Sequence, residues 1–160
     1  MTRTARIRFS LAALALAAGY FYLLIYITGW MSAHHWPSWW FDVFPSRHVG
    51  AVMWLVTLHT AGVLLAALPI GIAAVIIARM NAVLLALIAA SLATATAMAP
   101  SFAPTIWPTI WGSHPVFFIT DQIKLVIAAP FIAWVLRAAS SNNWFVRSRP
   151  AASVSQGVGG

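Results

Sequence analysis

The sequence contains no cysteine and no glutamate, and its only acidic residues are Asp42 and Asp121. The lack of thiols excludes disulfides, thiolate catalysis and thiolate metal sites. It also excludes the membrane proteins that form disulfides with the help of quinones. Any mechanism that needs two carboxylates side by side would have to bring Asp42 and Asp121 together.

Charge of either sign is scarce as well. Charged residues make up 7% of the chain, whereas hydrophobic residues make up 62%. This is far from the composition of globular domains in water, and it predicts that the bilayer is the solvent of a single domain. The net charge of +7 does not indicate a nucleic-acid partner, because the basic residues stand at the ends of apolar runs instead of along one polar face.

Four long apolar runs are present. Each is close to the roughly 20 residues that cross about 30 Å of hydrocarbon. Backbone groups in lipid must satisfy one another within the segment, so each run is predicted to be a helix. The fold class is therefore an all-α membrane protein with four transmembrane helices, at residues 9–31, 51–78, 83–98 and 116–136.

The first run also has features of a signal peptide, since Arg3, Arg6 and Arg8 precede "LAALALAAG". The apolar stretch continues through "YFYLLIYITGW", however, which is too long for a signal core. We therefore expect an uncleaved first helix.

Orientation follows from where the basic residues lie. Basic residues mark the cytoplasmic side of membrane proteins. This rule places both termini in the cytoplasm, predicts a bacterial inner-membrane location, and makes the polar segment 140–160 a disordered cytoplasmic tail. Seven of the nine basic residues flank the side assigned to the cytoplasm: Arg3, Arg6, Arg8, Arg79, Arg137, Arg147 and Arg149.

Two aromatic loops then face the outside. The first, "HHWPSWWFDVFPSRH" at residues 34–48, gathers histidine, tryptophan, proline, aspartate and arginine. The second, "APSFAPTIWPTIWGSHPVF" at residues 99–117, again combines tryptophan with proline. Tryptophan rings favour the membrane–water interface, so the favoured interpretation of these loops is anchoring. The predicted anchors are Trp36, Trp39, Trp40, Trp107 and Trp111.

Ionisable groups in the helices lie toward the same outer side. Counting from Arg79 at about 1.5 Å per residue puts His59 about 30 Å away, at the outer boundary. The same count from Arg137 puts Lys124 only about 20 Å away, where an ammonium needs a partner. Asp121 lies three residues before Lys124, so we expect an ion pair. With no ionisable residue deeper in the helices, a proton-coupled carrier and a voltage sensor are excluded.

Three kinds of outer site are alternatives to simple anchoring. A transition metal would use imidazole and carboxylate ligands. A haem would need two axial histidines, His59 with His114 or His48. An enzyme acting on a lipid head group would pair His48 or His59 with Asp42 or Asp121 and clamp phosphate with Arg47 and Lys124. We favour no cofactor. The candidate ligands are His34, His35, Asp42, Arg47, His48, His59, His114, Asp121 and Lys124.

Small residues recur at spacings of four within the helices. Such faces let helices approach closely, either within one chain or between subunits. Packing within the chain is the favoured interpretation, and contact with a membrane-protein partner or a second copy is the alternative. The faces comprise Ala15 and Gly19, Gly62 and Ala66, and Ala86, Ala90 and Thr94.

The composition, the topology and the small-residue faces together predict the function. We expect a non-catalytic accessory or assembly subunit of a larger membrane complex.

Overall fold

The computed structural model describes residues 3–32, 38–102 and 115–141. Several residues named above lie outside the described residues: His34, His35, Trp36, Trp107, Trp111 and His114. The same holds for the predicted tail beyond Ser141.

The described residues are helical except for a bend at residues 44–46. The elements are α1 (Arg3–Ser32), η1 (Ser38–Val43), α2 (Arg47–Ala78), η2 (Arg79–Asn81), α3 (Ala82–Met98), η3 (Ala99–Phe102) and α5 (Pro115–Ser141), where η marks a 3-10 helix. The four apolar runs lie within α1, α2, α3 and α5.

Three helical stretches among the described residues are long and apolar enough to cross a membrane. They are Arg3–Met31, Arg47–Ser101 and Phe118–Ser140. The middle stretch has 55 residues and contains both α2 and α3, joined through η2. Length and composition therefore agree with an integral membrane protein.

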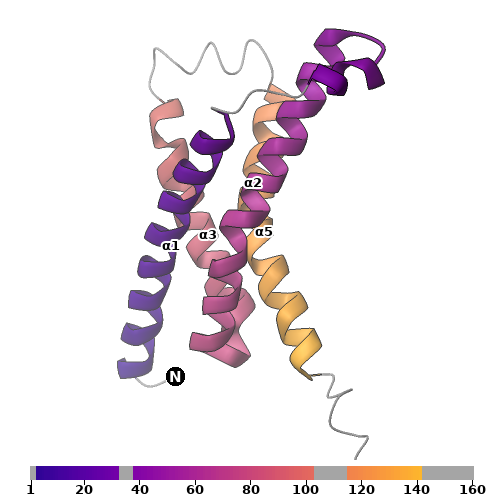
Figure 1. Ribbon diagram of the computed structural model, residues 1–160. Coiled ribbons are helices and arrows are strands. Elements are labelled where there is room, and N and C mark those ends of the chain that lie inside the picture. The colour runs from indigo at the N-terminus through magenta and orange to yellow at the C-terminus, as the bar shows by residue number, and fades with distance from the viewer. Residues whose placement is uncertain (1–2, 33–37, 103–114, 142–160) are drawn as a thin grey trace, which may run out of the picture.

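The helices form a bundle in which α1 and α5 lie on opposite sides of a central pair (Figure 1). Both α1 and α5 pack against α2 and α3, and α2 also contacts α3. The start of α1, η2 and the last turns of α5 lie at one end, which we call the basic end because it carries Arg3, Arg79 and Arg137. The starts of α2 and α5 lie at the other, which we call the aromatic end because η1 carries Trp39 and Trp40.

Alanine fills most of the core between the helices. Small side chains allow close helix approach, which is how membrane helices gain dispersion contacts without a hydrophobic driving force. The closest approach involves Gly71 of α2, where an added Cβ would lie 2.6 Å from Cγ2 of Ile132 on α5. The crossing of α2 and α5 therefore requires glycine. The alanines with no exposed surface are Ala66, Ala67, Ala74, Ala82, Ala86, Ala89, Ala90, Ala129 and Ala133.

Most of the small-residue faces are used inside this bundle. Gly62 and Ala66 of α2 and Ala86, Ala90 and Thr94 of α3 are all buried. Their burial supports the favoured interpretation of packing within the chain. On α1, Ala15 is exposed and Gly19 is half-buried, so contact between subunits through that face stays a prediction.

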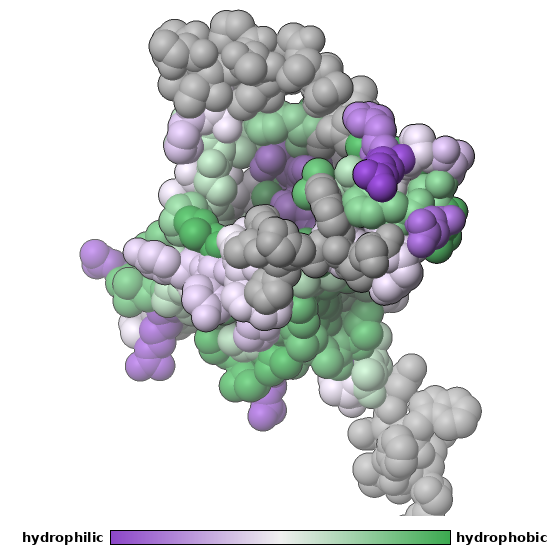
Figure 2. Space-filling model, turned by 45° about the horizontal axis from the view of Figure 1, so that its top comes forward, coloured by the Kyte–Doolittle hydropathy of each residue, from purple (hydrophilic) through white to green (hydrophobic). Residues whose placement is uncertain are grey.

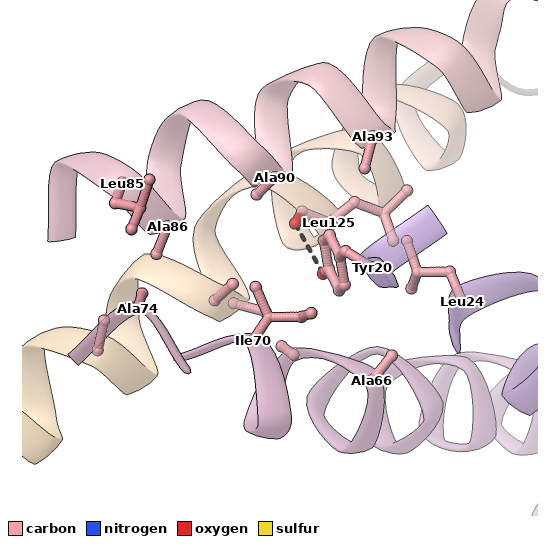
Figure 3. Packing of buried hydrophobic residues seen from close by; sticks show 14 of the residues in the cluster. Tyr20, Leu24, Ala66, Ile70, Ala74, Leu85, Ala86, Ala90, Ala93 and Leu125 are labelled. Carbon is pink, nitrogen blue, oxygen red and sulfur yellow. Dashed lines mark hydrogen bonds between the residues drawn. The ribbon is translucent and has the colours of Figure 1, made fainter. Parts of the chain in front are cut away.

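A single tyrosine connects the two outer helices of the bundle. Tyr20 of α1 is fully buried, and its hydroxyl donates a 2.9 Å hydrogen bond to the carbonyl of Leu125 on α5. Figure 3 shows its ring between α2 and α3, pointing toward Leu125. A buried hydroxyl without a partner is costly, so this bond satisfies Tyr20 and ties α1 to α5.

At the basic end a second polar contact links two helical ends. Nη1 of Arg137 on α5 donates a 2.9 Å hydrogen bond to the carbonyl of Met80 in η2. Carbonyls at the end of a helix lack partners within it, and a basic side chain satisfies one of them here. The neighbouring Arg79 has φ of 28°, a positive value that non-glycine residues rarely adopt.

Candidate functional site

The start of α2 is fixed by side chains that precede it. Ser46 is its N-cap, and its Oγ accepts a 3.3 Å hydrogen bond from the amide of Val49. Trp40 of η1 donates from Nε1 to the carbonyl of Gly50 at 2.8 Å. A Cβ at Gly50 would lie 2.9 Å from Cδ1 of Phe41, so glycine leaves room for that ring. These contacts seat η1 directly on α2.

The tryptophans of η1 differ in their surroundings. The ring centroid of Trp40 lies 5.9 Å from that of Trp39, 5.2 Å from that of Phe44 and 5.1 Å from that of Trp54 on α2. Trp39 is 61% exposed. Trp40 thus has a packing role within the protein in addition to the anchoring that we predict, whereas Trp39 has the exposure that an anchor needs.

Three ionisable side chains meet where α2 faces α5. Nζ of Lys124 lies 2.7 Å from Oδ1 of Asp121, which confirms the ion pair expected from their spacing. Nδ1 of His59 lies 3.7 Å from the same carboxylate oxygen. This distance is too long for a hydrogen bond but close enough for electrostatic contact. We call His59, Asp121 and Lys124 the polar trio.

The contact with Asp121 places His59 of α2 beside the ion pair of α5. Figure 1 shows that α2 and α5 cross, and this crossing brings residues of the two helices together. The depth of His59 in the membrane, which we expect to be near the outer boundary, stays a prediction.

A cavity of about 610 Å³ opens beside the polar trio at the aromatic end. Figure 2 looks onto this end and shows hydrophilic side chains in a hollow among hydrophobic ones. α1, α2 and α5 all contribute to its walls. The described lining residues are Thr28, Met31, His48, Val49, Val52, Met53, Leu55, Val56, Leu58, His59 and Asp121.

Three buried polar atoms of the described residues have no hydrogen-bond partner. They are Nδ1 of His59, Oγ1 of Thr94 and Oε1 of Gln122. Each lies in the half of its helix nearer the aromatic end, since α2 and α5 begin there and α3 ends there. Unsatisfied buried groups are uncommon and call for a partner such as water or a ligand.

The structure brings together only some of the predicted site residues. His48, His59, Asp121 and Lys124 lie in or beside the cavity. Asp42 and Arg47 are exposed and are not among the described lining residues. Within residues 3–32, 38–102 and 115–141, no three histidine or aspartate side chains are grouped so that they could hold a metal ion. Metal and haem sites that use His34, His35 or His114 stay predictions.

Sequence reasoning missed the contribution of α1 to this site. Thr28 and Met31 are two ordinary residues of an apolar run, and no local pattern marks them as lining a cavity. The pairing of His59 with Asp121 was one of several combinations in the head-group hypothesis. This pair could be selected only once the crossing of α2 and α5 was known, and that crossing depends on Gly71.

Comparison with known proteins returns no match. No protein-family model matches the chain, and neither a curated protein nor a solved structure is significantly similar to it. Functional inference therefore rests on the residues and their geometry.

Proposed function

We propose that this chain is a four-helix protein of the bacterial inner membrane that serves as a non-catalytic accessory or assembly subunit of a larger membrane complex. The observation that carries the proposal is the packed middle of the bundle. Alanines of α2, α3 and α5 and the ring of Tyr20 fill the space between the helices. Such a core favours a static role within the membrane over passage of a substrate.

The surface of the bundle supports a place among lipids and other membrane proteins. Large apolar side chains are exposed on every long helix, including Tyr22 and Tyr26 of α1, Ile76 of α2 and Trp134 of α5. Lipid tails or the helices of a partner would cover this surface equally well, because both are apolar.

The position of the arginines supports both termini in the cytoplasm. Arg79 in η2 and Arg137 on α5 lie at the basic end together with the start of α1. Reporter fusions ending at Ser155 and at Ser46 test this orientation. We expect the first to report the cytoplasm and the second the periplasm. A periplasmic Ser155 would contradict the topology.

Purification from the native membrane in a mild detergent tests the accessory role. We expect a membrane protein to co-purify in fixed stoichiometry and to be identified by mass spectrometry. A chain that elutes alone, with a Soret band or one bound metal per molecule, would instead support a haem or metal protein of the outer face.

The cavity favours a second candidate, a ligand-binding protein of the outer face. Replacing His34, His35 and His48 by glutamine separates it from anchoring. If the aromatic loop only anchors, these changes leave assembly and metal content unchanged, and Trp36 and Trp39 tolerate phenylalanine. If the loop forms a site, the histidine changes abolish function at normal membrane abundance, and a His59 variant shares the defect.

A further inference from the structure

The two ends of the bundle differ in their balance of charge. At the aromatic end, Asp42 and Asp121 offset Arg47 and Lys124, so the positive and negative side chains are equal in number. These aspartates are the only acidic residues of the chain, so no acidic side chain is left to offset the arginines of the basic end. In the described part of the chain, that end carries Arg3, Arg6, Arg8, Arg79 and Arg137.

Different helices bring these arginines together. Nη1 of Arg137 on α5 donates to the carbonyl of Met80, and Arg79 is the residue before Met80 in η2. The helix that follows η2 directly, α3, packs against α1, whose first turns carry the other three arginines (Figure 1). Like charges gathered at one end of a bundle repel one another. An anion supplied from outside the chain would relieve this repulsion.

The arginines are accessible to such an anion. Arg3, Arg6, Arg8 and Arg79 are all exposed. Guanidinium groups bind phosphate oxygens through paired N–H donors, which makes arginine well suited to this anion. Phosphate is therefore a suitable head group for the partner of the basic end.

Large apolar side chains lie directly beside the arginines. Ile7 is exposed within the arginine group of α1. Ile76 and Met80, which are 73% and 74% exposed, stand on either side of Arg79. Both groups belong to stretches that are long and apolar enough to cross a membrane. A soluble anion would satisfy the arginines alone, whereas an anion attached to hydrocarbon chains also covers their apolar neighbours.

We propose that the basic end binds an anionic phospholipid. Its phosphate is held by the arginines of this end, and its acyl chains run along the exposed apolar side chains next to them. This proposal goes beyond the accessory role. It requires that the chain lies in a membrane, but it requires neither a partner protein nor a particular orientation, so either proposal can fail without the other.

Lipid competition on the purified full chain tests the proposal. The protein in dodecyl maltoside is mixed with equal amounts of phosphatidylglycerol and phosphatidylcholine that have the same acyl chains, and the lipids that co-elute with it on gel filtration are quantified. We expect a preference for phosphatidylglycerol that falls as ionic strength rises. Arg79→Gln and Arg6→Gln should each lower the preference by about fivefold, the contribution of one arginine near a membrane surface.

Arg47→Gln provides the matched control. It removes an exposed arginine at the aromatic end, where acidic residues are present, and should leave the preference unchanged. All three variants are first shown to melt cooperatively within a few degrees of the parent, and Arg6→Gln serves alone if Arg79→Gln does not. Equal retention of the two lipids by the parent chain, or the same loss of preference in Arg47→Gln as in the basic-end variants, would overturn the proposal.

Discussion

The two halves of the bundle differ in how tightly their side chains pack and in how many buried polar atoms they contain. Toward the basic end, Gly71 lies against Ile132, alanines fill the core, and Arg137 closes the end by binding the Met80 carbonyl. Toward the aromatic end, the helices separate around a cavity, and the described part of the chain has its unpartnered buried polar atoms there. The packed half holds the helices in register, and this leaves the open half free to carry polar groups that add little stability.

This contrast predicts that substitutions in the packed half cost more than substitutions at the aromatic end. Replacing Gly71 by valine should have the largest effect, because a Cβ would lie 2.6 Å from Cγ2 of Ile132 and 3.2 Å from the amide nitrogen of Ala133. We expect a loss of about 3 kcal/mol in unfolding free energy, measured by denaturation in mixed micelles.

Gly29→Val is the matched control, since nothing lies within 4 Å of a Cβ at that position. Adding Ile132→Ala to Gly71→Val should recover part of the lost stability. Equal losses for the two glycine variants would show that the close crossing does not hold the bundle together.

Tyr20→Phe comes next. It removes the buried hydrogen bond to Leu125 while keeping the ring. We expect a loss of about 1 to 2 kcal/mol in the same denaturation assay. Tyr22→Phe is the control, because Tyr22 is exposed on the same helix. If both variants unfold like the parent chain, the tie between α1 and α5 contributes nothing to stability.

The ion pair at the aromatic end should have a smaller effect, because Asp121 and Lys124 are partly exposed. Asp121→Ala leaves an uncompensated ammonium and should cost about 1 kcal/mol. The double variant Asp121→Ala with Lys124→Ala should be more stable than the single one, as a thermal melt would show. A double variant as poor as the single one would mean that the pair is not coupled.

The smallest effect is expected where η1 meets α2. Trp40→Phe removes the hydrogen bond to the Gly50 carbonyl and should cost about 0.5 kcal/mol, measured as a shift of the thermal melt. Trp39→Phe should be silent in the same melt, because Trp39 is mostly exposed. Equal behaviour of the two variants would remove the distinction between a packed and an anchoring tryptophan.

The parts of the structure that depend on local sequence were predictable. Apolar runs located the stretches that form α1, α2, α3 and α5, because a backbone in lipid has to be helical. The pair of Asp121 and Lys124 follows from a spacing of three residues on one helix.

Features that join distant segments were not predictable. The contact between His59 and Asp121 depends on how α2 and α5 cross, where Gly71 meets Ile132. The bond from Tyr20 to Leu125 joins residues of two helices that are separated by the central pair. No periodicity within either helix carries this information, because it is set by how whole helices cross.

The connection η2 has only three residues, Arg79–Asn81. In the proposed topology this short connector makes α2 and α3 a helical hairpin that leaves the insertion machinery as one unit, because α3 cannot lag far behind α2. At 17 residues α3 spans about 26 Å, slightly less than the hydrocarbon layer, so its insertion benefits from an attached longer helix. A chain that stalls after Asn81 during synthesis would have α1 available to pack against α2 but would lack α3. Insertion of the hairpin thus adds α3 to a face of α2 that α1 also contacts.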